Sequence, residues 1–434
     1  MRAAELRAFG DLGGDAAAGI AELARGVHEA VAGRVFSALG PPAAPVRVVH
    51  DTIAATSYRG ARALAGSVVR AGTFAGGLAV DDDAPSVSES GRGRALVAAL
   101  NGAWGDRLTA RGSPLALSMT VRAQRRDVGL DRASLASAFG AATPRVAVFV
   151  HGLGESDDSW RRRGIGNCAP YGERLATDHG FTPVYVRYNS GLHISANGRT
   201  LAALLDKLTA SWPCGVSELA LVGHSMGALV LRSACHYGSE AGHRWPERVR
   251  SVFALGAPYT GAPLERAANM AGHGLSLVPE ARPFARPLTL RAAGVKDLRH
   301  GYLIDSDWDG RDPDALRSPA AADVPWSEHA DHYFVSATLS ADPGAASGRL
   351  LGDLLVLRRS AWAQRGRGGP GSGAQRLRFE LDHYRNLGEA NHFDLLNHPA
   401  VYEQLSRWLS GRSARGRARV ALAAPCAAAA TDRP

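Results

Sequence analysis

Residues 219–231 read Leu-Ala-Leu-Val-Gly-His-Ser-Met-Gly-Ala-Leu-Val-Leu. The first apolar run ends at Val222 and is short and unbroken, as in a strand that is buried on both faces. A second apolar run continues beyond Gly227 with helical spacing. Gly223 and Gly227 carry no side chain, so the backbone can bend sharply on either side of Ser225. A strand, a tight turn and a helix around Gly-x-Ser-x-Gly form the structural context of a serine nucleophile.

The pentapeptide alone is a weak signal, because 50 of the 434 residues are glycine. A Gly-rich turn with a surface serine is the alternative interpretation. The surrounding pattern favours the nucleophile, since short strands alternate with helices on both sides of this segment. Such alternation predicts an α/β fold with a doubly wound, mostly parallel sheet. The expected strands are Val146–Val150, Val184–Tyr188, 219–222, Val249–Leu255, Tyr333–Leu339 and Leu377–Leu381.

The chain divides into three parts. Residues 1–112 form a helical region, residues 113–410 the α/β domain, and residues 411–434 a basic tail that we expect to be disordered. The α/β domain opens with a hairpin, and its segment 257–331 interrupts the alternation in the way that a cap over an active site does.

Apolar stripes mark two of the helices in the N-terminal region. We expect both stripes to be buried against the neighbouring domain, because amphipathic helices of soluble proteins usually pack in this way. Prolines at 41, 42 and 45 separate the first helix from the second. The stripes are Ile20, Leu23, Val27, Val31 and Val35 on the first helix, and Leu96, Leu100, Trp104 and Leu108 on the third.

The composition indicates where the protein resides and which partners it does not bind. The formal net charge is +9, but arginine, alanine and glycine are abundant throughout, and neither an aromatic–basic platform nor a zinc spacing indicates nucleic-acid binding. The four cysteines form no C-x-x-C pair, which favours free thiols. Residues 1–14 lack the apolar segment of a secretory signal, and no run of 18 apolar residues appears. We therefore expect a cytoplasmic protein.

A serine hydroxyl is a poor nucleophile unless a histidine accepts its proton, an acid orients that histidine, and N–H donors stabilise the oxyanion. In a doubly wound sheet of this kind the order along the chain is oxyanion loop, Ser, Asp and His. The expected strand Val146–Val150 runs into His151-Gly152-Leu153-Gly154, where glycines let the backbone curl. The predicted donors are the N–H groups of Leu153 and Met226, and His151 is expected to be a structural anchor.

His392 is the predicted base, since it follows the last strand and precedes the last helix. His383 and His398 compete with it but have poorer positions, at a strand end and at a helix start. Asp353 is the predicted acid, and Asp342 is its main competitor.

An acidic turn, Asp305-Ser306-Asp307-Trp308-Asp309-Gly310, is similar to the first half of a calcium-binding loop. Its twelfth position is Leu316, where such a loop has a bidentate glutamate. A solvated acidic turn is the favoured interpretation. We therefore assign no metal and no cofactor.

Together these motifs resemble the α/β-hydrolase superfamily, and within it the bacterial triacylglycerol lipases and esterases and the GPI-inositol-deacylase-like group. The resemblance covers roughly residues 113–410 and implies the fold and a Ser-His-Asp triad. Those lipases often hold calcium, but its ligands cannot be matched here. The segments that carry the resemblance are His-Gly-Leu at 151–153, Gly-His-Ser-Met-Gly at 223–227, Leu-Gly-Ala-Pro at 255–258, Gly-Asp-x-x-Val at 352–356 and Asn-His-Phe-Asp at 391–394.

The predicted function is serine-type carboxylic ester hydrolysis of acyl or other apolar esters, with Ser225, His392 and Asp353 as the triad. The partner is then a small-molecule or lipid ester, and no nucleic acid is expected. Two alternatives stay open. One is an acyltransferase with the same triad. The other is a non-catalytic module whose helical region and basic tail contact a membrane or a polymer surface.

Overall fold

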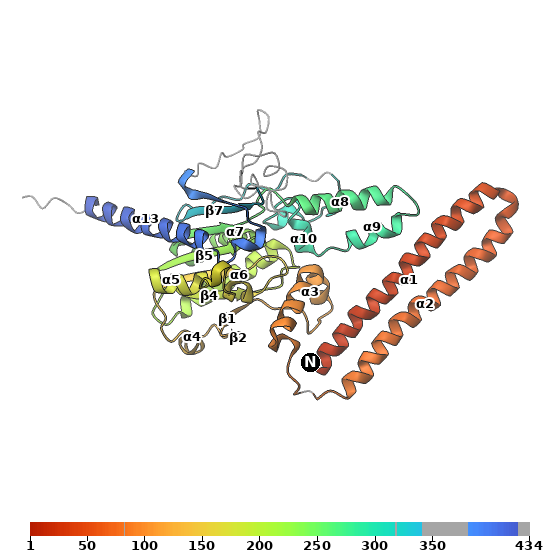
Figure 1. Cartoon of the computed structure of the whole chain (residues 1–434), viewed down its shortest axis with the longest axis horizontal. Helices are drawn as coiled ribbons and strands as arrows, with labels where there is room; N and C mark the ends of the chain where they lie inside the picture. Colours follow the sequence, from red (N-terminus) through yellow and green to blue (C-terminus); the bar gives the residue numbers. More distant parts are fainter. Residues whose placement is uncertain (82, 317–318, 341–380, 424–434) are drawn as a thin grey trace, which may run out of the picture.

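A single mixed sheet forms the centre of the molecule (Figure 1). The computed structural model describes residues 1–81, 83–316, 319–340 and 381–423. In this part of the chain the sheet has eight strands in the order β2-β1-β4-β3-β5-β6-β7-β8. They are β1 Thr120–Ala123, β2 Arg126–Val128, β3 Arg145–Val150, β4 Thr182–Arg187, β5 Glu218–His224, β6 Val249–Leu255, β7 Asp331–Thr338 and β8 Tyr384–Gly388.

Strands β3 to β8 are mutually parallel, whereas β1 is antiparallel to both of its neighbours. The prediction of a doubly wound, mostly parallel sheet is therefore confirmed. Most of the expected strand Leu377–Leu381 lies outside the described residues, and the last strand described begins at Tyr384. The register places Val150 beside Gly223 and Gly223 beside Ala254, so the carboxyl ends of three central strands lie at one edge.

Helices cover both faces of the sheet, because alternate strand residues point to opposite sides. On one face, Val148 and Leu221 join the core of α6 and α7. On the other, Phe149 and Val222 pack with residues of α5 and α13. The helices of this domain are α4 Arg132–Ala138, α5 Tyr171–His179, α6 Ile194–Ser211, α7 Met226–Glu240 and α13 Pro399–Ala423.

The N-terminal region begins with two long antiparallel helices, α1 Ala3–Leu39 and α2 Ala44–Leu78, which project from the sheet as an arm (Figure 1). A one-turn helix, Pro41–Ala43, joins them, so the prolines separate the helices as predicted. Helix α3, Gly91–Ala110, instead packs on the α/β domain.

The predicted burial of the two apolar stripes is wrong in large part. The side chains of Ile20, Val31 and Val35 are 69%, 49% and 52% exposed, and Leu96 and Trp104 of α3 are also exposed. The reason in α3 is steric, since its small residues are the ones that allow close contact with the domain. Its buried residues are Gly93, Val97, Ala98, Asn101, Gly102, Gly105 and Leu108.

The segment between β6 and β7 carries three helices, α8 Pro263–Ser276, α9 Arg282–Thr289 and α10 Ala293–Asp297. Helix α9 adjoins α1, and α10 adjoins α3, where the Ala293 N–H donates to Asp106 at 3.2 Å. One-turn helices complete the described structure. They are Val87–Glu89, Asp157–Arg161, Ile165–Asn167, Trp245–Arg248, Asp305–Asp307, Leu381–His383 and His392–Leu395.

The acidic turn at 305–310 is partly buried, contrary to the expectation of a solvated turn. The Asp307 side chain is 1% exposed and accepts N–H groups of Leu303 at 2.8 Å and Ala322 at 2.6 Å. This carboxylate therefore ties backbone segments together. Among the described residues, no group of three or more His, Cys, Asp or Glu side chains has the arrangement of a metal site.

None of the described helices combines the length and the apolar character that crossing a bilayer requires. Helix α13 continues beyond the closing helix expected from the sequence, which ended at Leu409, and reaches Ala423.

Candidate active site

Ser225 occupies a sharp turn between β5 and α7. Its backbone has φ 52° and ψ −122°, a conformation that non-glycine residues adopt only where the surroundings impose it. The Ser225 N–H donates to the Leu255 carbonyl at 2.7 Å, which fixes the turn against the end of β6. The serine is partly exposed, whereas His224 and Met226 on either side are fully buried. The strand–turn–helix context expected from the sequence is therefore present.

The two glycines that flank Ser225 are required by close backbone packing. A Cβ atom at Gly227 would lie 2.3 Å from the Val150 carbonyl oxygen, and one at Gly223 would lie 2.6 Å from the Ala228 nitrogen. Both distances are far shorter than a normal contact. The absence of side-chain bulk lets α7 start directly over the end of β3.

The loop after β3 lies beside the serine. A Cβ atom at Gly152 would be 3.1 Å from the Ser225 Cβ atom, so this loop and the turn at Ser225 are in contact. Gly154 has φ +68°, and its N–H donates to the Ser190 hydroxyl at 2.9 Å. Leu153 therefore lies between two glycines, of which Gly152 contacts the turn at Ser225. Met226 is the first residue of α7, so its N–H is one of those left without a helical acceptor.

His151 anchors this loop, as the sequence predicted. The ring is fully buried, stacks on Tyr188 with the centroids 4.4 Å apart, and has its Nδ1 atom 2.9 Å from the Gly152 carbonyl oxygen. The Tyr188 N–H faces Nε2 at 3.3 Å. Burial lowers the pKa of His151 and favours the neutral ring. With a carbonyl at Nδ1 and an N–H at Nε2, the proton belongs on Nδ1.

A buried polar chain runs from this loop to His392. Glu155 accepts the Gly152 N–H at 3.1 Å, and its Oε1 atom lies 2.8 Å from His224 Nδ1. On the other side of that ring, His224 Nε2 lies 3.2 Å from the His392 carbonyl oxygen. Burial raises the pKa of Glu155, but His224 and the Gly152 N–H outweigh it and lower the pKa to about 2. Glu155 was not among the residues predicted for the site, although it follows Gly152 by only three residues.

His392 lies at the same edge of the sheet as Ser225. It follows β8 and starts a one-turn helix that Asn391 caps through the Phe393 N–H at 2.9 Å. The ring is 2% exposed and packs against Gly256, where a Cβ atom would be 2.8 Å from His392 Cε1. Gly256 directly follows Leu255, whose carbonyl accepts the Ser225 N–H. Ser225 and His392 thus adjoin consecutive residues at the end of β6.

The two competing histidines are placed differently. His383 precedes β8 and has its Nδ1 atom 3.2 Å from the His332 carbonyl oxygen, at the opposite edge of the sheet. His398 accepts the Ala400 N–H at 3.2 Å at the start of α13. Asp353 and Asp342, the two candidates for the acid, lie outside the described residues.

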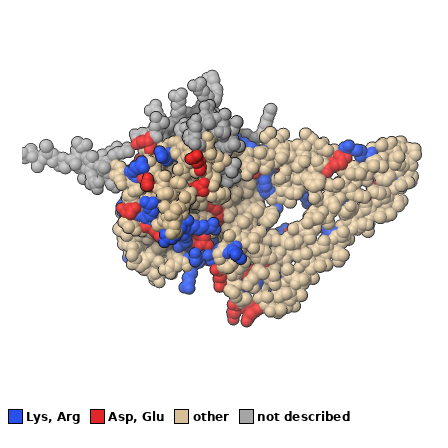
Figure 2. All heavy atoms as spheres, in the orientation of Figure 1, with Lys and Arg blue, Asp and Glu red and all other residues tan. Residues whose placement is uncertain are grey.

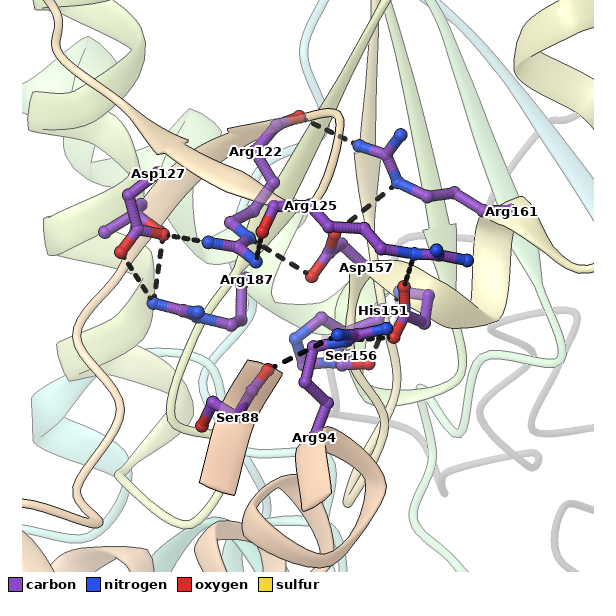
Figure 3. Close-up of polar contacts among 12 residues, drawn as sticks. Ser88, Arg94, Arg122, Arg125, Asp127, His151, Ser156, Asp157, Arg161 and Arg187 are labelled. Atoms are coloured by element: carbon purple, nitrogen blue, oxygen red, sulfur yellow. Dashed lines mark hydrogen bonds and ion pairs between the residues drawn. The ribbon is translucent and has the colours of Figure 1, made fainter. Parts of the chain in front are cut away.

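Ion pairs fix residues 157 and 158, which follow the loop after β3 (Figure 3). The fully buried Asp157 lies between Arg122 of β1 and Arg161, at 3.6 Å and 3.5 Å. Its neighbour Asp158 pairs with Arg94 of α3 and with Arg125 of the β1–β2 turn. These contacts connect the loop after β3 to the hairpin and to α3.

Helix α3 also touches the loop directly. A Cβ atom at Gly102 would lie 2.8 Å from the Cα atom of Gly154, and one at Gly105 would overlap the Asn189 amide. Asn189 in turn donates to the Gly105 carbonyl at 2.9 Å. No residue of 1–112 was predicted to take part in the site, yet α3 supports the loop beside Ser225. The pair of glycines three residues apart in α3 is the signal that could have indicated it.

No protein-family model matches the chain, and no curated protein matches it. Solved structures do match. A Bacillus licheniformis lipase in its mature form is 20% identical, with a TM-score of 0.37, over 60% of this chain and 91% of that one. A metagenomic carboxyl esterase is 17% identical, with a TM-score of 0.36, over 62% and 76%. A thermophilic esterase from Thermogutta terrifontis is 12% identical, with a TM-score of 0.32, over 62% and 91%.

The chain has the α/β-hydrolase fold. Its own topology carries this conclusion: a mostly parallel sheet covered on both faces, with a serine on a sharp strand-to-helix turn at the carboxyl edge. The structural neighbours named above are lipases and esterases. At such a turn a serine can attack a carbonyl carbon, provided that a base and N–H donors stand beside it.

Proposed function

We propose that this protein is a serine carboxylic ester hydrolase that acts on acyl or other apolar esters. Ser225 is the nucleophile, His392 the general base, Asp353 the acid that orients it, and the N–H groups of Leu153 and Met226 the oxyanion donors. One observation carries the proposal. Ser225 is held with a positive φ at the end of β5, with Gly152 on one side and the end of β6, where His392 packs, on the other.

The proposed reaction has two steps, acylation of Ser225 and hydrolysis of the acyl-serine. The Ser225 hydroxyl oxygen attacks the ester carbonyl carbon while its proton passes to His392. The tetrahedral intermediate then expels the alcohol, which takes that proton, and an acyl-serine remains. Water attacks the acyl-serine with His392 again accepting a proton, and the carboxylic acid leaves as Ser225 is restored.

The loop after β3 and the start of α7 supply the electrostatic part of catalysis. Backbone N–H groups at the amino end of a helix are fixed in direction and have no helical acceptor. Such donors stabilise the developing oxyanion without reorganising, and each typically contributes ~3 kcal/mol to transition-state stabilisation. The anchoring of His151 and Glu155 supports this proposal, because both contact Gly152, which precedes Leu153 and lies beside Ser225.

The experiment is active-site labelling together with ester hydrolysis. A fluorophosphonate probe should label the full-length protein once, and Ser225→Ala should abolish both labelling and hydrolysis of p-nitrophenyl esters. Ser239→Ala, at the exposed end of the same helix, is the matched control and should behave as wild type. Continued hydrolysis by folded Ser225→Ala protein would overturn the assignment. Preferential transfer of the acyl group to an added alcohol would reassign the protein as an acyltransferase.

A further inference from the structure

A cleft lies between the arm and the rest of the molecule. Residues of α1, α3 and α9 form most of its wall, and its volume is about 1040 Å³. Figure 2 shows an opening between the arm and the domain, with basic side chains near its edge. Beside the cleft α1 and α9 touch, since a Cβ atom at Gly26 would lie 2.7 Å from the Pro283 side chain. The walls therefore leave a cavity of the size that small-molecule sites have, and another helix would have to separate them.

Apolar side chains cover most of the cleft wall. Ile20 of α1 is 69% exposed, Trp104 of α3 is 41% exposed and Leu290 after α9 is 40% exposed, although all three line the cavity. Helix α3 is kinked at Trp104, whose φ of −142° and ψ of 22° are not helical. Apolar side chains that are exposed within a concave site can be covered by a ligand lying between the walls. The body of such a ligand must be apolar.

The charged residues of the cleft have an excess of positive charge. Six arginines and three acidic residues line it, and each acid is already paired with an arginine of the lining. These pairs are Asp15 with Arg111, Glu22 with Arg286, and Glu29 with Arg25. The lining as a whole therefore attracts an anion.

Arg107 is the cation best placed to bind that anion. Within the part of the chain that the structure describes, no carboxylate pairs with its guanidinium. Arg107 is half-buried in the cleft and follows Trp104 by three residues, so the two side chains share one face of α3. Arg282 also pairs with no described carboxylate, but it is exposed and donates to the Ser276 carbonyl at 3.2 Å. A half-buried guanidinium is less screened by salt, and it can bind a carboxylate through two parallel hydrogen bonds.

We propose that this cleft binds a long-chain carboxylate, with the apolar tail along Ile20 and Trp104 and the carboxylate on Arg107. The choice of a carboxylate over other anionic head groups rests on the proposed function, because hydrolysis of an acyl ester releases such a molecule. The site is distinct from that of Ser225. Helix α3 stands between the two, since Gly102 on its other side contacts the loop after β3. Binding in the cleft itself needs no chemistry at Ser225.

The test is equilibrium dialysis of radiolabelled dodecanoate against full-length Ser225→Ala protein, in which no acyl-serine can form. Dodecanoate should bind and saturate one site, and dodecan-1-ol, which has the same tail and no charge, should bind roughly tenfold more weakly. Arg107→Ala in this parent should weaken dodecanoate binding roughly tenfold and leave the binding of dodecan-1-ol unchanged. Ile20→Glu places a carboxylate beside the tail and should weaken the binding of both ligands roughly tenfold or more.

Two control variants match these changes outside the cleft. Arg92→Ala removes an exposed arginine from the first turn of α3, and Ile53→Glu adds the same charge at an exposed isoleucine of α2. Both should bind dodecanoate as the parent does. Circular dichroism verifies that every variant keeps the fold of the parent.

Three results would overturn the proposal. Equal binding of dodecanoate by Ile20→Glu and the parent would place the ligand outside the cleft. An Arg107→Ala variant that binds dodecanoate as the parent does, or that loses both ligands alike, would show that Arg107 does not hold the carboxylate. Equal affinity of the parent for dodecanoate and dodecan-1-ol would contradict an anionic head group. Dodecanoate binding as predicted in a protein that hydrolyses no ester would support this inference and overturn the catalytic proposal, so the two failures are distinguishable.

Discussion

The Nδ1 atom of His224 lies 2.8 Å from the Oε1 atom of Glu155, and the pair links the loop after β3 to the strand that carries Ser225. The same imidazole faces the His392 carbonyl oxygen at 3.2 Å. A single buried ring therefore contacts both the loop that holds Leu153 and the residue proposed as base.

Glu155→Gln should lower kcat for a soluble ester by roughly tenfold to a hundredfold, because displacements below 1 Å at reacting groups have effects of this size. KM should change little, since the substrate does not touch Glu155 in the proposed site. Steady-state kinetics measures both. Glu240→Gln removes an exposed glutamate 3.3 Å from His236 and is the control, which should retain wild-type kinetics. A kcat equal to wild type in Glu155→Gln would contradict the positioning role of this carboxylate.

Glu155 should also make the folded state sensitive to acid. Its pKa is lowered from 4.5 to about 2 in the folded protein, so the carboxylate stabilises the fold at any pH above the unfolded value. This contribution is lost as the pH falls from about 4.5 to about 2, and it amounts to at most about 3 kcal/mol. Denaturant unfolding at several pH values should show a shallower decline for Glu155→Gln. Parallel pH profiles for the two proteins would refute the prediction.

Gly102→Val should disturb the loop beside Ser225, although Gly102 belongs to α3 and not to the sheet. A side chain there must push against Gly154, whose backbone is 2.8 Å from the position of the new Cβ atom. We expect a loss of about 1–3 kcal/mol in the free energy of unfolding together with a lower kcat. Ala110→Val, at the exposed end of the same helix, serves as the control. If the folded Gly102→Val protein kept full activity, α3 would have no influence on the loop.

His392→Ala should be nearly inactive, while His383→Ala should lose stability without losing the chemistry. His392 packs against Gly256 at the carboxyl edge of the sheet, and His383 lies at the other edge beside Tyr333, with the ring centroids 4.5 Å apart. Activity is compared at a temperature where both variants stay folded by circular dichroism. An inactive His383 variant beside an active His392 variant would reverse the assignment of the base.

Asp353→Asn should keep the fold and substrate binding and reduce turnover by orders of magnitude, because the imidazole loses the charge that orients it. Asp342→Asn is the comparison, since that residue follows β7 closely in the sequence. The measurement is kcat for one soluble ester in both variants. Impaired turnover confined to Asp342→Asn would move the acid to that position.

Many strands and turns of the α/β domain could be predicted from the local pattern of apolar residues and glycines. The strand Val249–Leu255 was predicted with the bounds that β6 has, because its apolar residues 252–255 run without interruption up to Gly256. The turn at Ser225 was predicted from two glycines, and both prove to be required by contacts of less than 3 Å. The other predicted strands that can be compared differ from β3, β4, β5 and β7 by one or two residues at their ends, where local pattern is weakest.

Long-range contacts could not be read in the same way. The amphipathic pattern of α1 is present as predicted, yet Ile20 is 69% exposed, because it lines an open cleft between α1 and α9 and does not pack in a core. A helical pattern shows that two faces differ, and only the neighbouring segments determine which of them is buried. Glu155 was overlooked for the same reason, since its partner His224 lies on another strand.

The sequence by itself determined the alternating strands and helices, the backbone bend at Ser225 and the loop glycines beside it, because each depends on residues close together in the chain. The tertiary structure decided which histidine shares an edge with Ser225, that α3 supports the loop at Gly154, and that the apolar stripe of α1 stays largely exposed. Those outcomes depend on which distant segments meet in space, and a periodic pattern of side chains carries no information about its partner.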